Sequence, residues 1–228
     1  MCLYIQTLNK LKELSDEKYR EFSSKIANSK KQFLGVKIPT LKILAKEILK
    51  VNYVDYLNAC EFKYFEDTLL FGLIIAGLSY DEFLSRLPTY LDNIDSWSHV
   101  DSFVPAIKSV KKNKDDFFKI IKNQIFTAKD FHLRFLIICL MDFYLSEENL
   151  DFIFSAISKC DGKGYYVDMA IAWLISVAFV KFEVKTFNFI KNCKLSNFTL
   201  NKAISKIRDS FRVSREKKIL LQNYTRKN

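Results

Sequence analysis

The stretch IPTLKILAKEILK, residues 38–50, decides the fold of this chain because its apolar residues recur at three- and four-residue intervals. That spacing places them on one side of an α-helix, and the charged residues fall on the other side. Pro39 suits the first turn of a helix, where its missing N–H is not needed. The apolar side consists of Ile38, Leu41, Leu44, Ile48 and Leu49, and the side facing away carries Lys42, Lys46 and Glu47. The stretch therefore predicts an amphipathic helix.

The same periodicity continues through almost the whole chain. Five glycines and three prolines in 228 residues are too few for the many tight turns of a β-sandwich or a β-barrel. Further helical blocks are predicted at residues 52–60, 65–78, 80–90, 96–108, 114–126, 130–144, 147–158, 164–181, 183–192, 197–210 and 214–224. The sequence thus predicts an all-α protein of about a dozen short helices.

The joints between these blocks are short, and none has the composition of a linker. Short joints make consecutive helices antiparallel neighbours, and the pairs recur about every 35 to 40 residues. This organisation is typical of an α-solenoid of HEAT-like helix pairs, which curves and offers a concave face to a rod-shaped partner. We therefore expect one domain over residues 1–228 with a basic concave face, and a compact helix bundle is the alternative.

Composition indicates the kind of partner. The chain carries 36 Lys and Arg against 26 Asp and Glu, a formal net charge of +10. Such an excess favours a polyanion, with nucleic acid first and an anionic membrane surface second. The longest apolar run, MAIAWLISVAFV at 169–180, is about half the length that a bilayer crossing needs. We expect a soluble cytoplasmic monomer with no membrane partner.

The sequence lacks several well-known catalytic motifs. Its five cysteines are odd in number and never form a CxxC pair, so neither a disulfide framework nor a zinc site is expected. A glycine-rich phosphate loop, an HExxH motif and a GxSxG motif are also missing. The sequence therefore excludes the usual apparatus of ATP hydrolysis, zinc catalysis and triad acyl transfer, and it predicts no cofactor and no metal.

The segment DSWSHVDSF, residues 95–103, gathers one of the two Trp and one of the two His residues of the chain beside two Asp. Trp97 and Asp101 are four residues apart, so on a helix their side chains share one face, and His99 points elsewhere. One interpretation is structural, with Asp95 or Ser96 capping the helix and Asp101 meeting an exposed Lys. The other is that Trp97 and Asp101 are half of an active site.

Two further residues carry the same ambiguity. Arg134 lies within the apolar block FHLRFLIICLM, and a buried guanidinium is costly without a carboxylate or phosphate partner. It is either one side of a structural salt bridge or a group that grips a phosphate or orients Asp101. Trp173, in AIAWLISVAF, is either a core aromatic or part of a binding surface.

Basic residues gather at the end of the chain. Residues 199–228 contain nine Lys or Arg and two acids, a net charge of +7. We expect one helix on which Lys202 and Lys206 share a face and Arg208 and Arg212 share another, each offered to phosphates. The residues expected to pack between them are Ala203, Ile204, Ile207 and Phe211. Lys108, with Lys111 and Lys112, adds a second basic spot at the end of the DSWSHVDSF helix. A merely solvated basic face is the alternative.

Four segments together resemble the AlkD-type DNA alkylation repair family, the alkylpurine DNA glycosylases built from HEAT-like repeats. FLGVKIPTLKILAKEI at 33–48 is similar to the family's FLG(I/V)xxPxxR segment, and SWSHVDSFVP at 96–105 is similar to its SWWDSVDSxVP segment. YYVDMAIAWLISVAFVK at 165–181 resembles its FFIxKAIGWxLRExxK helix, and NKAISKIRDSFRVSREK at 201–217 resembles its closing basic helix. The likeness spans nearly the whole chain in the same order.

The resemblance implies a function and a set of site residues. It implies hydrolysis of the N-glycosidic bond of cationic N3- and N7-alkylated purines in duplex DNA, with the base left stacked and without metal or nucleotide cofactor. The family's catalytic Trp and Asp match Trp97 and Asp101, its Arg matches Arg134, and its second aromatic wall matches Trp173. The protein would then associate with the nucleoid when bound to DNA.

The chain departs from the family pattern on its second helix. Active members carry a Tyr there, a little before the FLG segment, that helps to wall the lesion. The corresponding place here is near Ile26, and the closest tyrosine is Tyr19. A catalytically silent adaptor with the same fold, binding DNA, RNA or an acidic protein through its cations, is therefore the competing interpretation.

Overall fold

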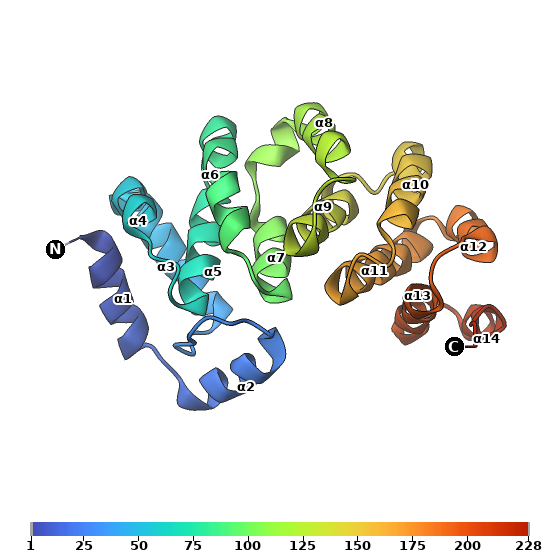
Figure 1. The fold of residues 1–228 in the computed structure, drawn as a ribbon, viewed down its shortest axis with the longest axis horizontal. Helices are drawn as coiled ribbons and strands as arrows, with labels where there is room; N and C mark the ends of the chain where they lie inside the picture. The colour runs from blue at the N-terminus through green and yellow to red at the C-terminus, as the bar shows by residue number, and fades with distance from the viewer. Residues whose placement is uncertain (1, 228) are drawn as a thin grey trace. The chain divides into compact units, whose positions relative to one another are not determined.

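The computed structural model describes residues 2–227, and this part of the chain is helical throughout with no strand (Figure 1). The all-α prediction is confirmed, and the packing of successive helices in pairs is that of an α-solenoid. An isolated parallel bridge joins Gln32 to Tyr64. The chain divides into two compact units, of which the first ends at Asn113 and the second begins at Lys114. The single domain over 1–228 and the basic concave face stay predictions.

The first unit holds α1 (Leu3–Glu13), α2 (Glu17–Ala27), α3 (Ile38–Val51), α4 (Tyr53–Ala59), α5 (Phe65–Ile75), α6 (Tyr80–Asn93), α7 (Trp97–Phe103) and the 3-10 helices η1 (Val104–Ala106) and η2 (Ser109–Lys112). Its centre is α5, every residue of which is buried. On α5 pack α3, α6 and α7. This arrangement places α7 against the central helix α5.

The helix predicted from IPTLKILAKEILK is α3, and it has the expected face. Leu41, Leu44 and Ile48 are buried against the unit, whereas Lys42 and Lys46 are exposed. Each such buried Leu or Ile side chain contributes about 2 kcal/mol relative to an exposed one. The apolar period thus supplies the free energy that holds α3 on α5.

The loop before α3 is fixed by a buried carboxylate. Glu66, only 1% exposed, accepts hydrogen bonds from the backbone N–H groups of Leu34, Gly35 and Val36 at 3.0, 2.7 and 3.2 Å. Gly35 has φ 89°, and a Cβ at this position would lie 2.4 Å from the carbonyl oxygen of Asp16. Only glycine fits this backbone without strain. The FLG segment therefore has a structural role, because it anchors the chain between α2 and α3.

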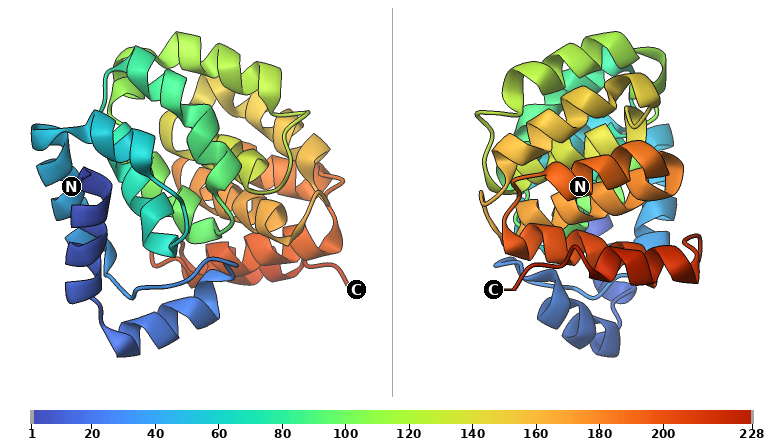
Figure 2. Two further views of the ribbon diagram at one scale, coloured as in Figure 1. Left: turned by 60° about the vertical axis from the view of Figure 1, so that its left-hand side comes forward. Right: turned by 90° about the vertical axis from the view of Figure 1, so that its right-hand side faces the viewer.

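The second unit holds α8 (Lys114–Gln124), α9 (Asp130–Phe143), η3 (Glu147–Asn149), α10 (Leu150–Cys160), α11 (Tyr165–Lys181), α12 (Glu183–Asn192), α13 (Asn197–Asp209) and α14 (Arg215–Gln222). Its centre is α11, which packs between α9 and α13, and Figures 1 and 2 show these three helices side by side. The partly exposed stripe of α11 is narrow and consists of Tyr166, Met169, Trp173, Val177 and Val180.

Several predicted helices end earlier than expected, and the block at 65–78, for example, is α5 only as far as Ile75. The block at 96–108 is α7 only as far as Phe103, because Pro105 has no N–H to continue the α-helical pattern and the chain tightens into η1. The block at 197–210 stops at Asp209, and Ser210 turns the chain out of the helix. Ser214 then caps α14. Within residues 2–227 no helix is long and apolar enough to cross a membrane.

Candidate functional site

The accessible face of α7 carries the first pair of candidate residues. Ser96 caps the helix, and its side chain accepts a hydrogen bond from the N–H of Ser98. Ser96 was one of the two caps that the sequence predicted. Trp97 and Asp101 are both half-buried and lie one turn apart on the side of α7 that also carries Ser98 and Ser102. The predicted helix with Trp97 and Asp101 on one face is confirmed.

The start of α7 is tied to the end of α2 by hydrogen bonds. The indole N–H of Trp97 donates to the carbonyl oxygen of Ile26 at 3.0 Å, and the buried hydroxyl of Ser96 donates to that of Ala27. These carbonyls belong to the last turn of α2, where helix geometry leaves them without intrahelical partners. The contact therefore satisfies carbonyl groups at the end of α2 and restricts the indole ring to one orientation.

Asp95 extends this connection across the loop that follows α2. Both carboxylate oxygens of Asp95 accept from the hydroxyl of Ser29 at 2.8 Å, and one also accepts from the N–H of Lys30 at 2.9 Å. A carboxylate that accepts several hydrogen bonds holds its donors in a fixed arrangement. We call Asp95, Ser96 and Trp97, together with Ile26, Ala27, Ser29 and Lys30, the α2–α7 joint.

His99 lies beneath the joint, fully buried, and is not a surface ligand. Its Nδ1 lies 3.4 Å from the N–H of Asp95 and accepts from it, so its Nε2 carries the proton and donates to the carbonyl oxygen of Phe65 at 3.2 Å. Its ring also packs on the ring of Phe65, with 4.4 Å between centroids. Burial lowers the pKa of His99 from 6.5 to about 4, although the nearby Asp95 carboxylate opposes this. The imidazole is therefore neutral at pH 7.

A cavity of about 130 Å³ opens beside Trp97, between α2 and α7. Its walls are mostly apolar and consist of Tyr19, Phe22, Ser23, Ile26, Ala27, Val36, Ile38, Phe65, Leu69, Trp97 and Ser98. Both Ile26 and Tyr19 therefore line the same space as Trp97. Tyr19 precedes Ile26 by seven residues, which is two turns of α2. Tyr19 therefore lines the cavity although it does not stand where the family has its tyrosine.

Arg134 and Trp173 lie in the second unit, on α9 and α11. Arg134 is 5% exposed, and its Nη1 donates to the carbonyl oxygen of Tyr166 at 2.6 Å. Arg134 thus connects α9 to the first turn of α11. The sequence around Arg134 did not indicate that its partner is a backbone carbonyl. Trp173 is half-buried on the partly exposed stripe of α11, so it is neither wholly core nor wholly surface.

The predicted cations are accessible, but their arrangement differs from the prediction. Lys108, Lys202, Arg208 and Arg212 are exposed and Lys206 is half-buried. Arg212 and Phe211 follow the end of α13, so Arg208 and Arg212 do not share a helix face, and Phe211 is fully exposed instead of packed. The reason is that the chain turns at Ser210, which brings Val213 into the core. Lys108 likewise follows η1, and its N–H donates to the carbonyl oxygen of Ala76.

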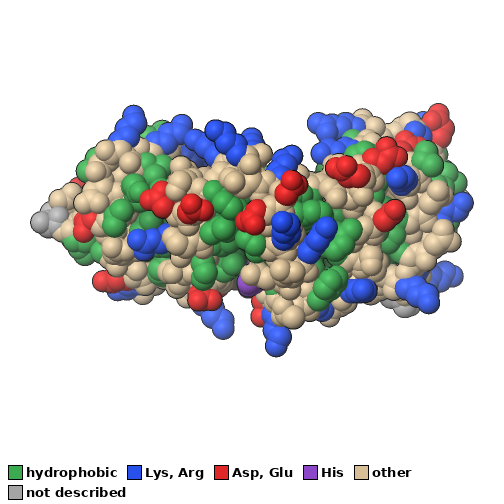
Figure 3. All heavy atoms as spheres, turned by 90° about the horizontal axis from the view of Figure 1, so that it is seen from above, with side chains coloured by type: hydrophobic (Ala, Val, Ile, Leu, Met, Phe, Trp, Pro, Cys, Tyr) green, Lys and Arg blue, Asp and Glu red, His purple; other side chains and the backbone are tan. Residues whose placement is uncertain are grey.

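Figure 3 shows one face of the molecule, on which Lys and Arg side chains project with acidic side chains among them. Among residues 2–227 no cluster of three or more His, Cys, Asp or Glu side chains could hold a metal ion. The first unit thus offers a carboxylate and an indole on one helix face, and the second unit offers most of the candidate cations.

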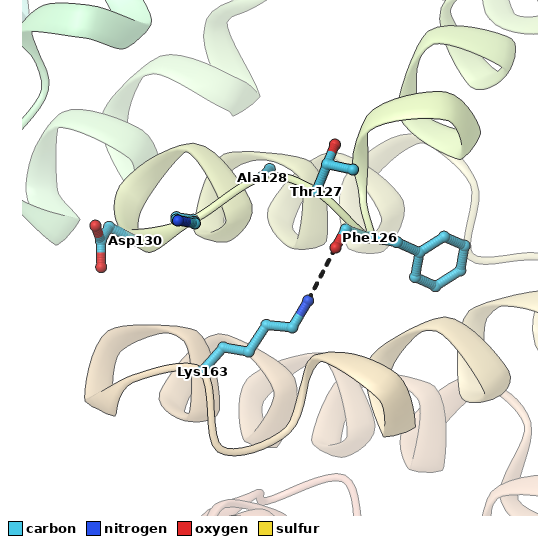
Figure 4. A pocket seen from close by; sticks show the side chains of 6 residues that line it. Phe126, Thr127, Ala128, Asp130 and Lys163 are labelled. Carbon is cyan, nitrogen blue, oxygen red and sulfur yellow. Dashed lines mark hydrogen bonds between the residues drawn. The ribbon is translucent and has the colours of Figure 1, made fainter.

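A second cavity lies in the second unit and was not predicted from the sequence. It measures about 380 Å³ and is lined by Phe126, Thr127, Ala128, Lys129, Asp130 and Lys163. Figure 4 shows Lys163 reaching across it to the carbonyl oxygen of Phe126, at 3.1 Å. The signal that could have found it is DGKGYY, because Gly162 and Gly164 both adopt positive φ and hold Lys163 in an exposed loop.

These features define an all-helical protein of packed helix pairs that presents an acid and an indole on one helix face. A family model described as DNA alkylation repair enzyme matches residues 7–207, and the chain therefore belongs to that family. The match includes Trp97, Asp101, Arg134 and Trp173, whereas Arg208 and Arg212 lie beyond it. No curated protein matches the chain. Membership supports an enzymatic role in DNA repair.

Proposed function

We propose that the protein is a monofunctional DNA glycosylase that removes cationic N3- and N7-alkylpurines from duplex DNA. The observation that carries this proposal is the geometry of α7. Trp97 and Asp101 share its accessible face, and the α2–α7 joint fixes the orientation of that face. An adaptor needs cations, but it does not need a carboxylate on the same helix face as an oriented indole.

The substrate explains why one carboxylate is sufficient. An alkyl group on N3 of adenine or N7 of guanine makes the base cationic, so the bond from the base to C1′ already tends to break. The base leaves as a neutral molecule with the bonding electrons, and positive charge develops on the deoxyribose. Water then adds to C1′ and gives up a proton. The carboxylate of Asp101 would stabilise the charge on the sugar and position this water.

The aromatic residues would contribute packing. Trp97 would lie against the deoxyribose, where the electron-rich face of an indole also favours a cationic centre. The hydrogen bond from its Nε1 to Ile26 keeps the ring from rotating out of that position. In the second unit, Trp173 is proposed to pack against the DNA backbone. Arg134 is proposed to bind a phosphate in addition to the carbonyl of Tyr166.

Affinity for DNA would come from the exposed cations and the half-buried Lys206. Lys108, Lys202, Lys206, Arg208 and Arg212 are proposed to contact phosphates, which gives binding that weakens as salt rises. Contact with the sugar and the backbone does not require the base to leave the helical stack, so the enzyme would avoid the unstacking cost of base flipping. We propose no metal and no nucleotide cofactor for this reaction.

The experiment that tests the proposal is release of free base from duplex DNA containing one N7-methylguanine. Wild type is compared with Asp101→Asn, at low and at moderate salt. Loss of a charge that stabilises the transition state is expected to slow release at saturating enzyme by about 100-fold or more. Asp92→Asn serves as the matched control, because Asp92 is an exposed carboxylate on α6 of the same unit.

Two results would count against the proposal. Full activity in Asp101→Asn would show that Asp101 has another role. No release by wild type, with salt-sensitive DNA binding intact, would favour the catalytically silent adaptor instead, since its exposed cations would then account for everything observed.

A further inference from the structure

Three aromatic side chains of the second unit are exposed where its helices are joined. Phe126 follows α8, Tyr165 begins α11 and Phe198 lies in the first turn of α13. Their exposed fractions are 42%, 58% and 37%. Large aromatic side chains are normally mostly buried, so such a group on one edge calls for an explanation. We call Phe126, Tyr165 and Phe198 the aromatic edge.

These residues lie close to one another although they come from three separate joints. The ring centroids of Tyr165 and Phe198 are 5.8 Å apart. Lys163, two residues before Tyr165, donates to the carbonyl oxygen of Phe126 at 3.1 Å (Figure 4). The 380 Å³ cavity beside Phe126 and the smaller cavity beside Tyr165 both have Lys163 and Asp130 in their walls. Tyr165 and Phe198 are therefore in ring contact, and Lys163 connects their loop to the backbone at Phe126.

Lysines alternate with the exposed rings. The Nζ of Lys159 lies 5.1 Å from the ring centroid of Phe126, and the Nζ of Lys202 lies 5.7 Å from that of Phe198. Lys129 and Lys163 are exposed in the wall of the larger cavity. Exposed rings interleaved with lysines form a positively charged surface on which planar groups can stack.

Few acidic groups oppose these cations. Asp161 is occupied within the protein, where it accepts from the N–H and hydroxyl of Ser196 and from the hydroxyl of Thr199. Asp130 is the acid that lines both cavities. The same Asp161 contacts join the loop before α11 to the start of α13. They therefore keep Tyr165 and Phe198 next to each other. Charge complementarity thus favours an anionic partner with planar groups.

We propose that the aromatic edge binds single-stranded nucleic acid, with bases stacked on Tyr165, Phe198 and Phe126 and phosphates against the lysines. Base stacking on aromatic side chains combined with a basic groove is the general mode of single-strand binding. A duplex cannot use it in the same way, because the faces of its bases are already covered by neighbouring bases. This activity is separate from base removal and uses neither Asp101 nor Trp97.

The test is fluorescence anisotropy of a labelled, lesion-free oligonucleotide of about 16 nucleotides, titrated with the full chain. Tyr165→Leu and Phe198→Leu keep an apolar side chain at each position and remove the flat ring. Each is expected to weaken single-strand binding by about 5-fold or more, since that is the lower range for one stacked base. Lys163→Gln tests the charge and is expected to reduce the salt dependence of binding.

Phe211→Leu is the matched control, because Phe211 is also a fully exposed aromatic of the second unit but follows the opposite end of α13. Binding that is unchanged in Tyr165→Leu and Phe198→Leu would overturn the proposal. Equal losses for a duplex of the same sequence would overturn it too, and would make this edge part of a duplex contact. Displacement by polyglutamate as effectively as by DNA would indicate an acidic protein partner and equally reject it.

The outcome is distinguishable from that of the proposed glycosylase, although Lys202 is proposed to take part in both. Base release from the methylated duplex depends on Asp101, so single-strand binding can fail while base release persists. Conversely, a protein without base release can still prefer single strands through Tyr165 and Phe198.

Discussion

The two units of this protein present their candidate functional residues in opposite ways. In the first unit, Trp97 and Asp101 lie on a helix of seven residues that is held by buried or half-buried polar contacts from Asp95, Ser96 and His99. In the second unit, most of the candidate cations project from the surface, and Arg134 alone among them is buried. The difference separates a site that needs a fixed geometry from a surface that needs only charge.

The energetic consequences differ accordingly. Leaving a buried donor or acceptor without its partner costs about 1–3 kcal/mol. An exposed cation contributes about 0–1 kcal/mol to folding, because water and salt screen it. Substitutions in the α2–α7 joint should therefore change stability and activity together, whereas substitutions of exposed cations should change binding alone.

The largest expected effect is that of pH on the free energy of unfolding, through His99. Its pKa is about 4 in the folded protein against 6.5 in the unfolded chain, so between these values only the unfolded chain binds the proton. The stability from this group is fully present above pH 6.5 and is lost as the pH falls toward 4. The 2.5-unit difference corresponds to about 3 kcal/mol in the free energy of unfolding.

The measurement is urea unfolding at pH 7, 6, 5 and 4, for wild type beside His99→Gln. A Gln amide can supply one donor and one acceptor as the neutral imidazole does, but it does not titrate. Stability should therefore fall more steeply with acid in wild type than in His99→Gln. Equal pH dependence in the two proteins would show that His99 is not a buried neutral group, and the contrast between the units would weaken.

The fold was largely predictable because its signal is repeated. Apolar spacing in IPTLKILAKEILK predicted α3, and Ser96 was one of two caps foreseen for α7. The ends of helices were less predictable. Pro105 shortened α7 and Ser210 ended α13, so that Phe211, expected to pack, is fully exposed. Periodicity reports which side of a helix is apolar, but the position of its end depends on single residues and on what packs next.

The site was predictable only in part, because its contacts join distant residues through the backbone. Nothing in the sequence around Arg134 indicates that the carbonyl of Tyr166 accepts from it, and any residue type at position 166 offers that group. Likewise Trp97 donates to Ile26 through a carbonyl that carries no sequence signature. Residue types and spacing identify Trp97 and Asp101, whereas the joint that orients Trp97 requires the structure.

A smaller effect is expected from Asp95→Asn. The amide offers one acceptor oxygen where the carboxylate offers two, so part of the bonding to Ser29 and Lys30 is lost, at about 1–2 kcal/mol. Trp97 should then be less restricted. In a Trp173→Phe background Trp97 is the sole tryptophan, and its fluorescence anisotropy should fall and its emission shift to the red. The Asp92→Asn protein provides the comparison, and an unchanged Trp97 signal would show that the joint does not orient the indole.

The smallest effect on folding is expected from substitutions of the exposed cations. These substitutions test whether the cations act in DNA binding alone. Arg208→Gln and Arg212→Gln should each change the free energy of unfolding by less than about 0.5 kcal/mol. Each should nevertheless weaken binding to duplex DNA and lower the slope of log affinity against log salt by about 1, as loss of one phosphate contact does. Lys46→Gln, at an exposed position on α3, should leave that slope unchanged.

Arg208 and Arg212 also differ in a way that the measurement can use. Arg208 lies on α13, whereas Arg212 lies in the turn between α13 and α14. If both contact phosphates, the double variant should lower the slope by about 2. A slope that changes for Arg208→Gln only would confine the binding surface to α13. A slope that changes for neither would make the basic end of the chain a solvated face, because a cation that contacts no phosphate releases no counterions from the DNA.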